Sequence, residues 1–281
     1  MHDELNEIIK KALDEDIKTG DITTMACLSQ SVEAEGTLLI KQDGVIAGLE
    51  VAAAVFNFVD PTLLFETYKK DGDEVKEGEI AGKVTGKAAS ILTAERTVLN
   101  ILQRMSGIAT FAKTFQDKVK HTKAKIIDTR KTAPGLRYLD KLAVKLGGCG
   151  NHRIGLYDMY LIKDNHIEAA GSLSAAVHAC KEHKSKTGKN YKIEVECSSI
   201  KQVEEAIAEG VDIIMLDNFK TSEMEKAVKL INGRCKVEAS GMVNLDTVKA
   251  IAETGVDYIS VGALTHSVKA MDISLKIKNI E

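Results

Sequence analysis

Two stretches, Glu209-Gly-Val-Asp-Ile-Ile-Met-Leu-Asp217 and Thr254-Gly-Val-Asp-Tyr-Ile-Ser-Val-Gly262, repeat one pattern: a glycine, a short apolar run, and an end at an acid or a glycine. Two more runs of this kind end at Glu196 and at Ser240, so the four ends are spaced by 21, 23 and 22 residues. Each interval holds one helix with apolar residues three and four positions apart. Regular strand–helix units of this length predict a parallel sheet, most simply a (β/α) barrel. The region is too short for eight full units, so we expect an incomplete barrel.

Upstream of the repeats, the pattern continues and then changes. Two earlier runs, Ile126-Ile127 and Tyr160-Leu-Ile162, read as further strands of the same sheet. The first third mixes strands and helices and predicts a compact α+β domain. Its expected elements are a helix over 3–15, a hairpin of 36–41 with 44–47, a helix over 50–58, strands over 63–68 and 79–84, and a long helix from Thr93 with a possible break at Gly107.

The bulk properties narrow the class of protein. The chain has 281 residues and a formal net charge of −3, with no basic tail, which argues against non-specific nucleic-acid binding. The acidic N-terminus lacks the apolar segment of a signal peptide, and the most apolar stretch, 44–59, is short for a membrane span. Five scattered cysteines without a Cys-x-x-Cys pair suit a reducing cytosol, so we expect a cytoplasmic protein.

The predicted strand ends carry chemically distinct side chains. In a barrel of parallel strands the carboxyl ends share one mouth. Cations follow the early strands, acids follow the middle ones, and small residues follow the last two. A cationic run inside an acidic protein predicts a site for a small molecule with several negative charges, although a solvated basic face is the commoner origin of such runs. The run contains Arg130, Lys131, Arg137, Lys141, Lys145, Arg153 and Lys163.

The acids and glycines suggest what else the site holds. Glu196 and Asp217 could bind ribose hydroxyls or Mg²⁺ on a phosphorylated substrate, or could simply pair with Lys131 or Lys163. Phosphate commonly lies on the loops after the last strands of such barrels, where Ser240-Gly241 and Gly262-Ala263 fall; the glycines could instead only turn the chain. Glu194 and Glu238 share the faces of the strand-end residues and rank lower.

Three residues allow other readings. Lys163 at a strand end could form a Schiff base, as in aldolases, but that needs a lowered pKa, which nearby acids would oppose. His152 and His266 are equally suited to proton donation, phosphate contact or a structural role. No P-loop, complete dinucleotide fingerprint, zinc-protease motif or nucleophile elbow is present.

The assembled motifs resemble the quinolinate phosphoribosyltransferase family over nearly the full chain. The resemblance implies an α/β protein with an N-terminal α/β sandwich domain (1–110), to which residues 270–281 are expected to return, and an incomplete α/β barrel (111–269). It also implies a homodimer or higher homo-oligomer in which Arg96 reaches the neighbouring subunit's site. The motifs are Glu95-Arg-Thr-Val-Leu-Asn100, Ser106-Gly-Ile-Ala-Thr110, Asp128-Thr-Arg-Lys-Thr-Ala-Pro-Gly-Leu-Arg137, Asn151-His-Arg-Ile-Gly-Leu156, Leu161-Ile-Lys-Asp-Asn-His166, Met215-Leu-Asp-Asn218 and Ser260-Val-Gly-Ala-Leu-Thr-His-Ser267.

The implied reaction joins quinolinate to 5-phosphoribosyl-1-pyrophosphate with loss of CO₂, using Mg²⁺ and no organic cofactor. Alternatives are a related transferase acting on another aromatic acid, a Schiff-base lyase, and a non-catalytic binder of phosphorylated ligands. The expected catalytic residues are Lys131, Lys163, Glu196 and Asp217, the last two also holding Mg²⁺-pyrophosphate and ribose. The expected substrate-binding set adds Arg96, Thr129, Arg130, His152, Arg153, Ser240, Gly241, Met242, Val261, Gly262, Ala263 and His266.

Two positions depart from the family pattern. Cys149 stands where a third consecutive glycine is usual, beside the expected carboxylate clamp. Met242 stands where the phosphate turn usually has a second glycine, and it would be strained there if the position requires a positive φ. We expect phosphate binding to survive, because the backbone N–H remains.

Overall fold

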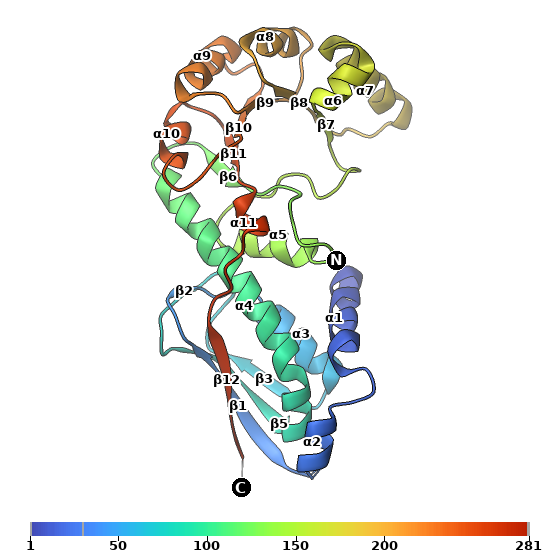
Figure 1. Ribbon diagram of the computed structural model, residues 1–281, viewed down its shortest axis with the longest axis vertical. Coiled ribbons are helices and arrows are strands. Elements are labelled where there is room, and N and C mark those ends of the chain that lie inside the picture. Colours follow the sequence, from blue (N-terminus) through green and yellow to red (C-terminus); the bar gives the residue numbers. More distant parts are fainter. Residues whose placement is uncertain (1, 30, 280–281) are drawn as a thin grey trace. The chain divides into compact units, whose positions relative to one another are not determined.

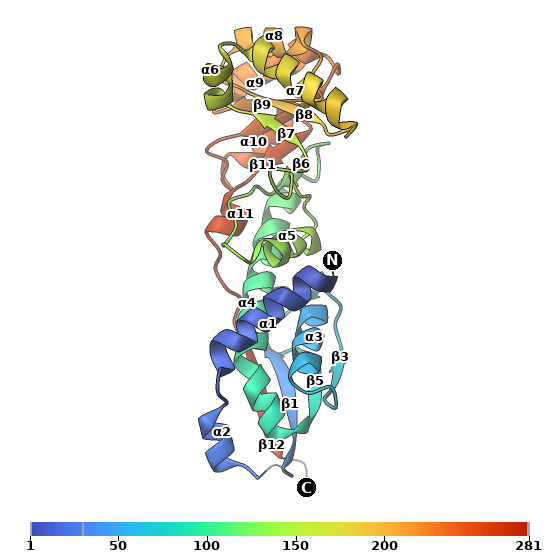
Figure 2. The same cartoon turned by 90° about the vertical axis from the view of Figure 1, so that its right-hand side faces the viewer.

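The computed structural model describes residues 2–29 and 31–279, which form two compact units (Figures 1 and 2). Unit 1 comprises residues 1–113, 132–148 and 264–281, and unit 2 comprises residues 114–131 and 149–263. The long helix α4 (Ala88–Val119) contributes to both. Among the described residues, no helix is both long and apolar enough to cross a bilayer.

Unit 1 is built on an antiparallel sheet in the order β12-β1-β5-β3, with helices packed along it. The C-terminal strand pairs with the first strand over seven residue pairs, as expected for a returning tail. The strands are β1 (Glu33–Ile40), β3 (Leu64–Thr67), β5 (Ile80–Lys87) and β12 (Ile273–Asn279), with β2 (Gly44–Val45) and β4 (Glu74–Val75) as a separate pair. The helices are α1 (His2–Ile17), α2 (Ile22–Cys27), α3 (Leu49–Val59), most of α4, α5 (Arg137–Leu146) and most of α11 (Ala263–His266).

Two expectations for unit 1 were wrong. The predicted hairpin of 36–41 with 44–47 does not form: β1 pairs with β12 and β5, while β2 pairs with β4. Helix α4 also begins five residues before Thr93 and continues through Gly107 without a break. A Cβ at Gly107 would lie 2.2 Å from the Lys269 carbonyl oxygen, so the glycine is required by close approach of another segment of unit 1.

The unit boundary differs from the expected one near residue 110. Residues 132–148, which include α5, group with unit 1 rather than with the barrel. The physical reason is a buried ion pair: Arg104 Nε and Nη2 of α4 each donate a 2.8 Å hydrogen bond to the Asp140 carboxylate, which is fully buried. The backbone of Ala109 also approaches Gly147 so closely that a Cβ there would lie 2.3 Å from its carbonyl oxygen.

Unit 2 is a parallel six-stranded sheet that does not close into a barrel, in the order β6-β11-β10-β9-β8-β7. Figure 1 shows its helices along the outer face of the curved sheet. The central strands are buried on both faces, as in β9, where only Asp217 at the end is partly exposed. The strands are β6 (Lys125–Ile127), β7 (Tyr160–Ile162), β8 (Ile193–Cys197), β9 (Ile213–Asp217), β10 (Lys236–Ser240) and β11 (Tyr258–Ser260), and the helices are α6 (Asp164–Ala170), α7 (Leu173–Thr187), α8 (Ile200–Ala208), α9 (Thr221–Ile231) and α10 (Val248–Glu253).

Candidate active site

The carboxyl ends of the unit 2 strands surround one cavity of about 560 Å³. The period-two alternation of strand side chains explains why residues at and two before each strand end face the same space. The predicted strand-end residues are therefore brought together. The lining residues are Thr129, Arg130, Lys131, His152, Arg153, Leu161, Lys163, Glu196, Met215, Asp217, Asn218, Glu238, Ser240, Gly241 and Ser260.

The cations enter the cavity after the two edge strands of the sheet, β6 and β7. Arg130 and Lys131 follow β6, and the Lys131 amide donates to the Thr129 hydroxyl at 3.1 Å, which turns the chain there. Lys163 follows β7, and its Nζ lies 3.2 Å from Glu196 Oε2, so the ion pair considered from the sequence is formed. A Schiff-base lysine needs an uncharged amine in an apolar or cationic pocket. The adjacent carboxylate argues against that chemistry for Lys163.

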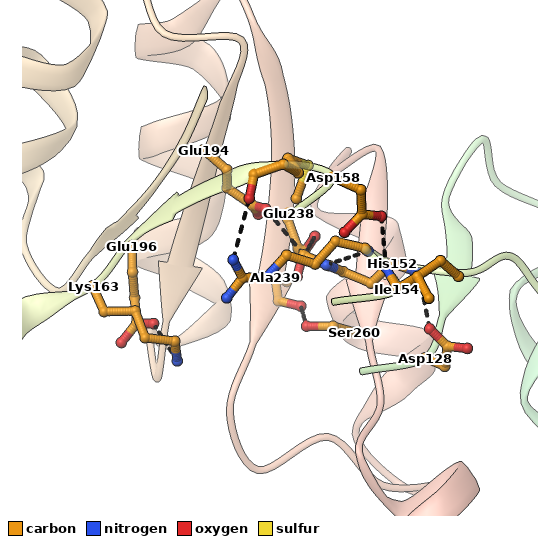
Figure 3. A network of polar contacts seen from close by, with 12 residues as sticks. Asp128, His152, Ile154, Asp158, Lys163, Glu194, Glu196, Glu238, Ala239 and Ser260 are labelled. Carbon is orange, nitrogen blue, oxygen red and sulfur yellow. Dashed lines mark hydrogen bonds and ion pairs between the residues drawn. The ribbon is translucent and has the colours of Figure 1, made fainter. Parts of the chain in front are cut away.

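The segment between α5 and β7, which carries Arg153, is held by hydrogen bonds to two aspartates. The fully buried Asp128 accepts hydrogen bonds from Asn151 Nδ2 at 2.6 Å and from the His152 amide at 2.9 Å. Asp158 accepts a hydrogen bond from the Ile154 amide (Figure 3) and another from the Gly155 amide. Arg153 Nη1 donates to the Met159 carbonyl, while its buried Nε has no hydrogen-bond partner among the described residues. Desolvation, followed by the charge of Arg130, lowers the pKa of Arg153.

The loops after β9 and β10, in the middle of the sheet, contain left-handed backbone. Asn218, Gly241 and Met242 have φ values of 56°, 89° and 48°. A Cβ at Gly241 would lie 2.1 Å from Asn218 Oδ1, so only glycine fits where the loops after β9 and β10 meet. Met242 adopts the positive φ anticipated for that position, and its side chain is 82% exposed, outside the cavity lining.

Beneath the cations lies a buried cluster of His152, Glu194 and Glu238 (Figure 3). His152 Nε2 is 3.0 Å from Glu194 Oε2 and 3.5 Å from Glu238 Oε2, and the side chains are 7%, 0% and 1% exposed. Desolvation raises the pKa of Glu194 to about 7. Desolvation, followed by the charge of Glu194, raises the pKa of Glu238 to about 8. The sequence ranked these acids low; their signal was the two-residue offset from Glu196 and Ser240.

Several residues named from the sequence do not line the cavity. Arg137, Lys141 and Lys145 belong to α5 of unit 1, and Lys141 is 3% exposed rather than part of a basic surface. Val261, Gly262 and Ala263 follow β11 and are also absent from the lining. Arg96 is exposed on α4, and His266 ends α11 with its Nδ1 2.7 Å from the Ser267 hydroxyl, both in unit 1.

Cys149, the other departure noted in the sequence, is buried in unit 2. Desolvation, followed by the charge of Asp128, raises the pKa of its thiol to about 12. The reactive thiolate is therefore scarce at neutral pH, and this cysteine packs as a small apolar residue.

An open barrel of parallel strands, with arginine and lysine after its two edge strands and two acids and a glycine turn after the strands between them, defines an enzyme class that acts on small phosphorylated anions. The comparisons with known proteins identify the family. Residues 21–106 match the family model for the N-terminal domain of quinolinate phosphoribosyl transferase, and residues 108–276 match that for its C-terminal domain. The chain belongs to the quinolinate phosphoribosyltransferase family.

Several known proteins are similar to this chain over nearly its whole length. The chloroplastic carboxylating nicotinate-nucleotide pyrophosphorylase of Arabidopsis thaliana is 48% identical over 98% of this chain and 83% of its own length. A probable nicotinate-nucleotide pyrophosphorylase of Bacillus subtilis is 43% identical over 98% and 94%. The crystal structure of NadC from Streptococcus pyogenes superposes with a TM-score of 0.95 at 38% identity, covering 100% of this chain and 99% of that one.

Proposed function

We propose that the protein transfers the phosphoribosyl group of 5-phosphoribosyl-1-pyrophosphate to quinolinate and releases pyrophosphate and CO₂, giving nicotinate mononucleotide for NAD biosynthesis. The observation that carries the proposal is the charge division of the cavity. Arg130, Arg153 and Lys163 meet there from β6, the following loop and β7, and Glu196 and Asp217 meet them from β8 and β9. Membership of the family supports this reading of the division.

The arginines and lysines of the cavity are assigned to binding the two carboxylates of quinolinate. The guanidinium groups of Arg130 and Arg153 can each meet a carboxylate with two parallel donors, and Lys131 and Lys163 add point charges. The unpartnered Nε of Arg153 leaves a donor for this purpose. Holding both carboxylates fixes the orientation of the pyridine ring, so that its nitrogen points toward the anomeric carbon that it attacks. Thr129 and His152 lie beside this clamp.

Glu196 and Asp217 are assigned to the ribose hydroxyls and to Mg²⁺ carried by pyrophosphate. Their donor set fits, because Mg²⁺ prefers one or two carboxylates together with phosphate oxygens. Glu196 has a 17% exposed side chain and Asp217 is partly exposed, so both are accessible from the cavity. When bound, the ion would neutralise charge on the leaving pyrophosphate. On substrate binding, the ion pair between Glu196 and Lys163 would break, and Glu196 would contact the substrate instead.

Phosphate binding is assigned to the loops after β10 and β11. Ser240, Gly241 and Met242 present consecutive backbone amides, and Gly241 allows the loop to approach Asn218 closely. Val261, Gly262 and Ala263 form the equivalent loop after β11, with His266 at the end of α11. These roles follow from the family resemblance and from the preference of such loops for phosphate.

The chain's residues suffice for the chemistry without a protein nucleophile. As pyrophosphate leaves, the pyridine nitrogen bonds to the anomeric carbon and becomes positively charged. The adjacent C–CO₂ bond then breaks, its electron pair stays on the ring carbon, and a proton replaces CO₂. Fixed charges in a water-poor cavity stabilise the separating ribosyl cation and pyrophosphate anion.

We also propose that the functional form is a homodimer or a larger homo-oligomer. Arg96, exposed near the start of α4, would then contribute to the site of the partner subunit. We propose a cytoplasmic setting on the strength of its five free cysteines, while the printed names of plant relatives place those proteins in chloroplasts or mitochondria.

A direct assay tests the proposal. The protein is incubated with phosphoribosyl pyrophosphate, Mg²⁺ and either quinolinate or nicotinate, and CO₂ and pyrophosphate are followed separately. Stoichiometric CO₂ and pyrophosphate from quinolinate are expected. Pyrophosphate release with nicotinate alone would refute the dicarboxylate assignment, and trapping of substrate on Lys163 by borohydride would favour a lyase instead.

A further inference from the structure

The buried cluster beneath the cations is built around the ring of His152. Its Nδ1 accepts a 2.8 Å hydrogen bond from the Arg153 amide, and an imidazole nitrogen can accept only when it carries no proton. The remaining ring proton therefore lies on Nε2, whose nearest acidic neighbours are Glu194 and Glu238. This tautomer is assigned from the hydrogen-bond partners. Nε2 thus faces the two acids, 3.0 Å from Glu194 Oε2 and 3.5 Å from Glu238 Oε2, and neither Glu194 oxygen has a hydrogen-bond partner among the described residues.

Both acids are placed by the sheet. Glu194 lies in β8 and Glu238 in β10, the two strands that flank β9, so their side chains converge on one side of it. Each is fully buried. Burying two adjacent carboxylates costs stability unless they are paired or share a proton, and an apolar pair would pack as well. Two buried acids that weaken the fold are consistent with a role other than stability.

The cluster also forms the floor of the cavity. His152, Arg153 and Glu238 line the 560 Å³ cavity and, equally, a smaller cavity of about 150 Å³ on the other side. A single layer of side chains separates the two spaces. The hydrogen bond from the Arg153 amide to His152 Nδ1 ties the ring to the backbone from which the Arg153 side chain enters the larger cavity.

We propose that Glu194 and Glu238 are positioning residues: through the His152 ring they fix the backbone of Arg153 and so aim its guanidinium at the carboxylate end of the cavity. This inference rests on the proposed function for the identity of the bound dicarboxylate. His152 then acts through Arg153, and the Arg153 guanidinium is the group that contacts substrate.

The first test measures which nitrogen of the His152 ring carries the proton, and it does not depend on enzyme activity. In protein labelled with ¹⁵N-histidine, the His152 resonances, assigned by their loss in H152Q, are expected to show the neutral Nε2–H tautomer. Glu194 and Glu238 are then replaced by methionine, singly and together. Methionine has a similar volume and no acceptor, and it should not destabilise the fold. A wild-type ring protonated on Nδ1, or a His152 Nε2–H resonance unchanged in the double variant, would overturn the proposal.

The second test separates the two substrates. The double methionine variant is expected to raise the KM for quinolinate by about tenfold or more, the range typical for partners that orient a binding side chain, and to change the KM for phosphoribosyl pyrophosphate by less than about twofold. E194Q and E238Q, which keep an acceptor oxygen, should recover most of the loss. The matched control is E253Q, since Glu253 pairs with His121 at 3.1 Å on the surface of the same unit.

The outcomes distinguish this proposal from the proposed function. An equal rise in the KM of both substrates would overturn the positioning role. A quinolinate KM unchanged within about threefold, in a variant whose His152 Nε2–H resonance has changed, would also overturn it. If the double methionine variant fails to fold, the single methionine variants supply the same comparison. If the wild type does not turn over quinolinate at all, the proposed function fails, while the tautomer measurement still decides whether the acids orient His152.

Discussion

Replacing Glu238 by methionine should stabilise the protein, and by more as the pH rises. Burial raises the pKa of Glu238 from an ordinary 4.5 to about 8. Below pH 4.5 the folded and unfolded chains both hold the proton, so burial of this group costs little. Between pH 4.5 and 8 the unfolded chain loses the proton while the folded chain keeps it, so stability falls with rising pH. Above pH 8 both forms are ionised and the loss is constant.

The size of the effect follows from the same pKa. At about 1.4 kcal/mol per pKa unit, the destabilisation by Glu238 is about 1 kcal/mol at pH 5, about 3 kcal/mol at pH 7, and between about 4 and 5 kcal/mol above pH 9. Glu238→Met removes it. For a unit of roughly 130 residues, about 1 kcal/mol moves the melting temperature by about 3–4 °C. The variant should therefore melt a few degrees above the wild type at pH 5 and at least about 10 °C above it at pH 8.

Differential scanning calorimetry of wild type and E238M from pH 5 to 9 measures this difference directly. The wild type supplies the common pH dependence of all other groups, so only the gap between the curves matters. E253Q, at an exposed glutamate, should follow the wild type at a constant offset. Parallel curves for wild type and E238M, or a gap that narrows as the pH rises, would show that Glu238 is not a buried acid with a raised pKa.

Four further outcomes are expected. Arg130→Ala should lower kcat/KM by on the order of 10²-fold, about 3 kcal/mol for a lost charge-assisted clamp, and an effect under about threefold would remove Arg130 from the site. Met242→Gly should raise stability by about 0.5–1 kcal/mol, because relief of a φ of 48° outweighs glycine's entropy, with KM for phosphoribosyl pyrophosphate unchanged. Asp140→Ala should cost about 3–5 kcal/mol by urea unfolding, because it strands the Arg104 guanidinium. Chelation of Mg²⁺ by EDTA should abolish pyrophosphate release, and excess Mg²⁺ should restore it; full activity in EDTA would contradict the metal assignment.

The sequence predicted the barrel and its mouth because both depend on local periodicity. Strand ends spaced by 21 to 23 residues locate Glu196, Asp217 and Ser240 before any coordinates are known, and parallel topology then forces them to one edge. What periodicity cannot supply is the pairing of distant segments. The chain 36–47 alternates like a hairpin, yet β1 pairs with strands more than 40 and 230 residues further along.

The same limit explains the misassigned part of the cationic run. Lys141 and Lys145 follow Arg130 closely in sequence, and their spacing indicated a shared basic site. Their helix, α5, is held against α4 by the ion pair between Asp140 and Arg104. These two residues are 36 positions apart, so no local sequence pattern indicates that they pair. Only contacts along α4 reveal that α5 belongs to unit 1.

Two glutamates lie at different depths relative to the cations of the cavity, Glu196 on the lining and Glu194 beneath it. Arg130, Arg153 and Lys163 line the same cavity, and the charge of Arg130 adds to desolvation in lowering the pKa of Arg153. Glu196 offsets Lys163 at the surface of the cavity and is free to exchange for substrate. Glu194 lowers the repulsion from beneath, where it acts on Arg153 while contributing nothing to the cavity lining. At that depth Glu194 can stabilise the charge of Arg153 without occupying the place of a substrate carboxylate. An acid on the cavity lining would compete for that place.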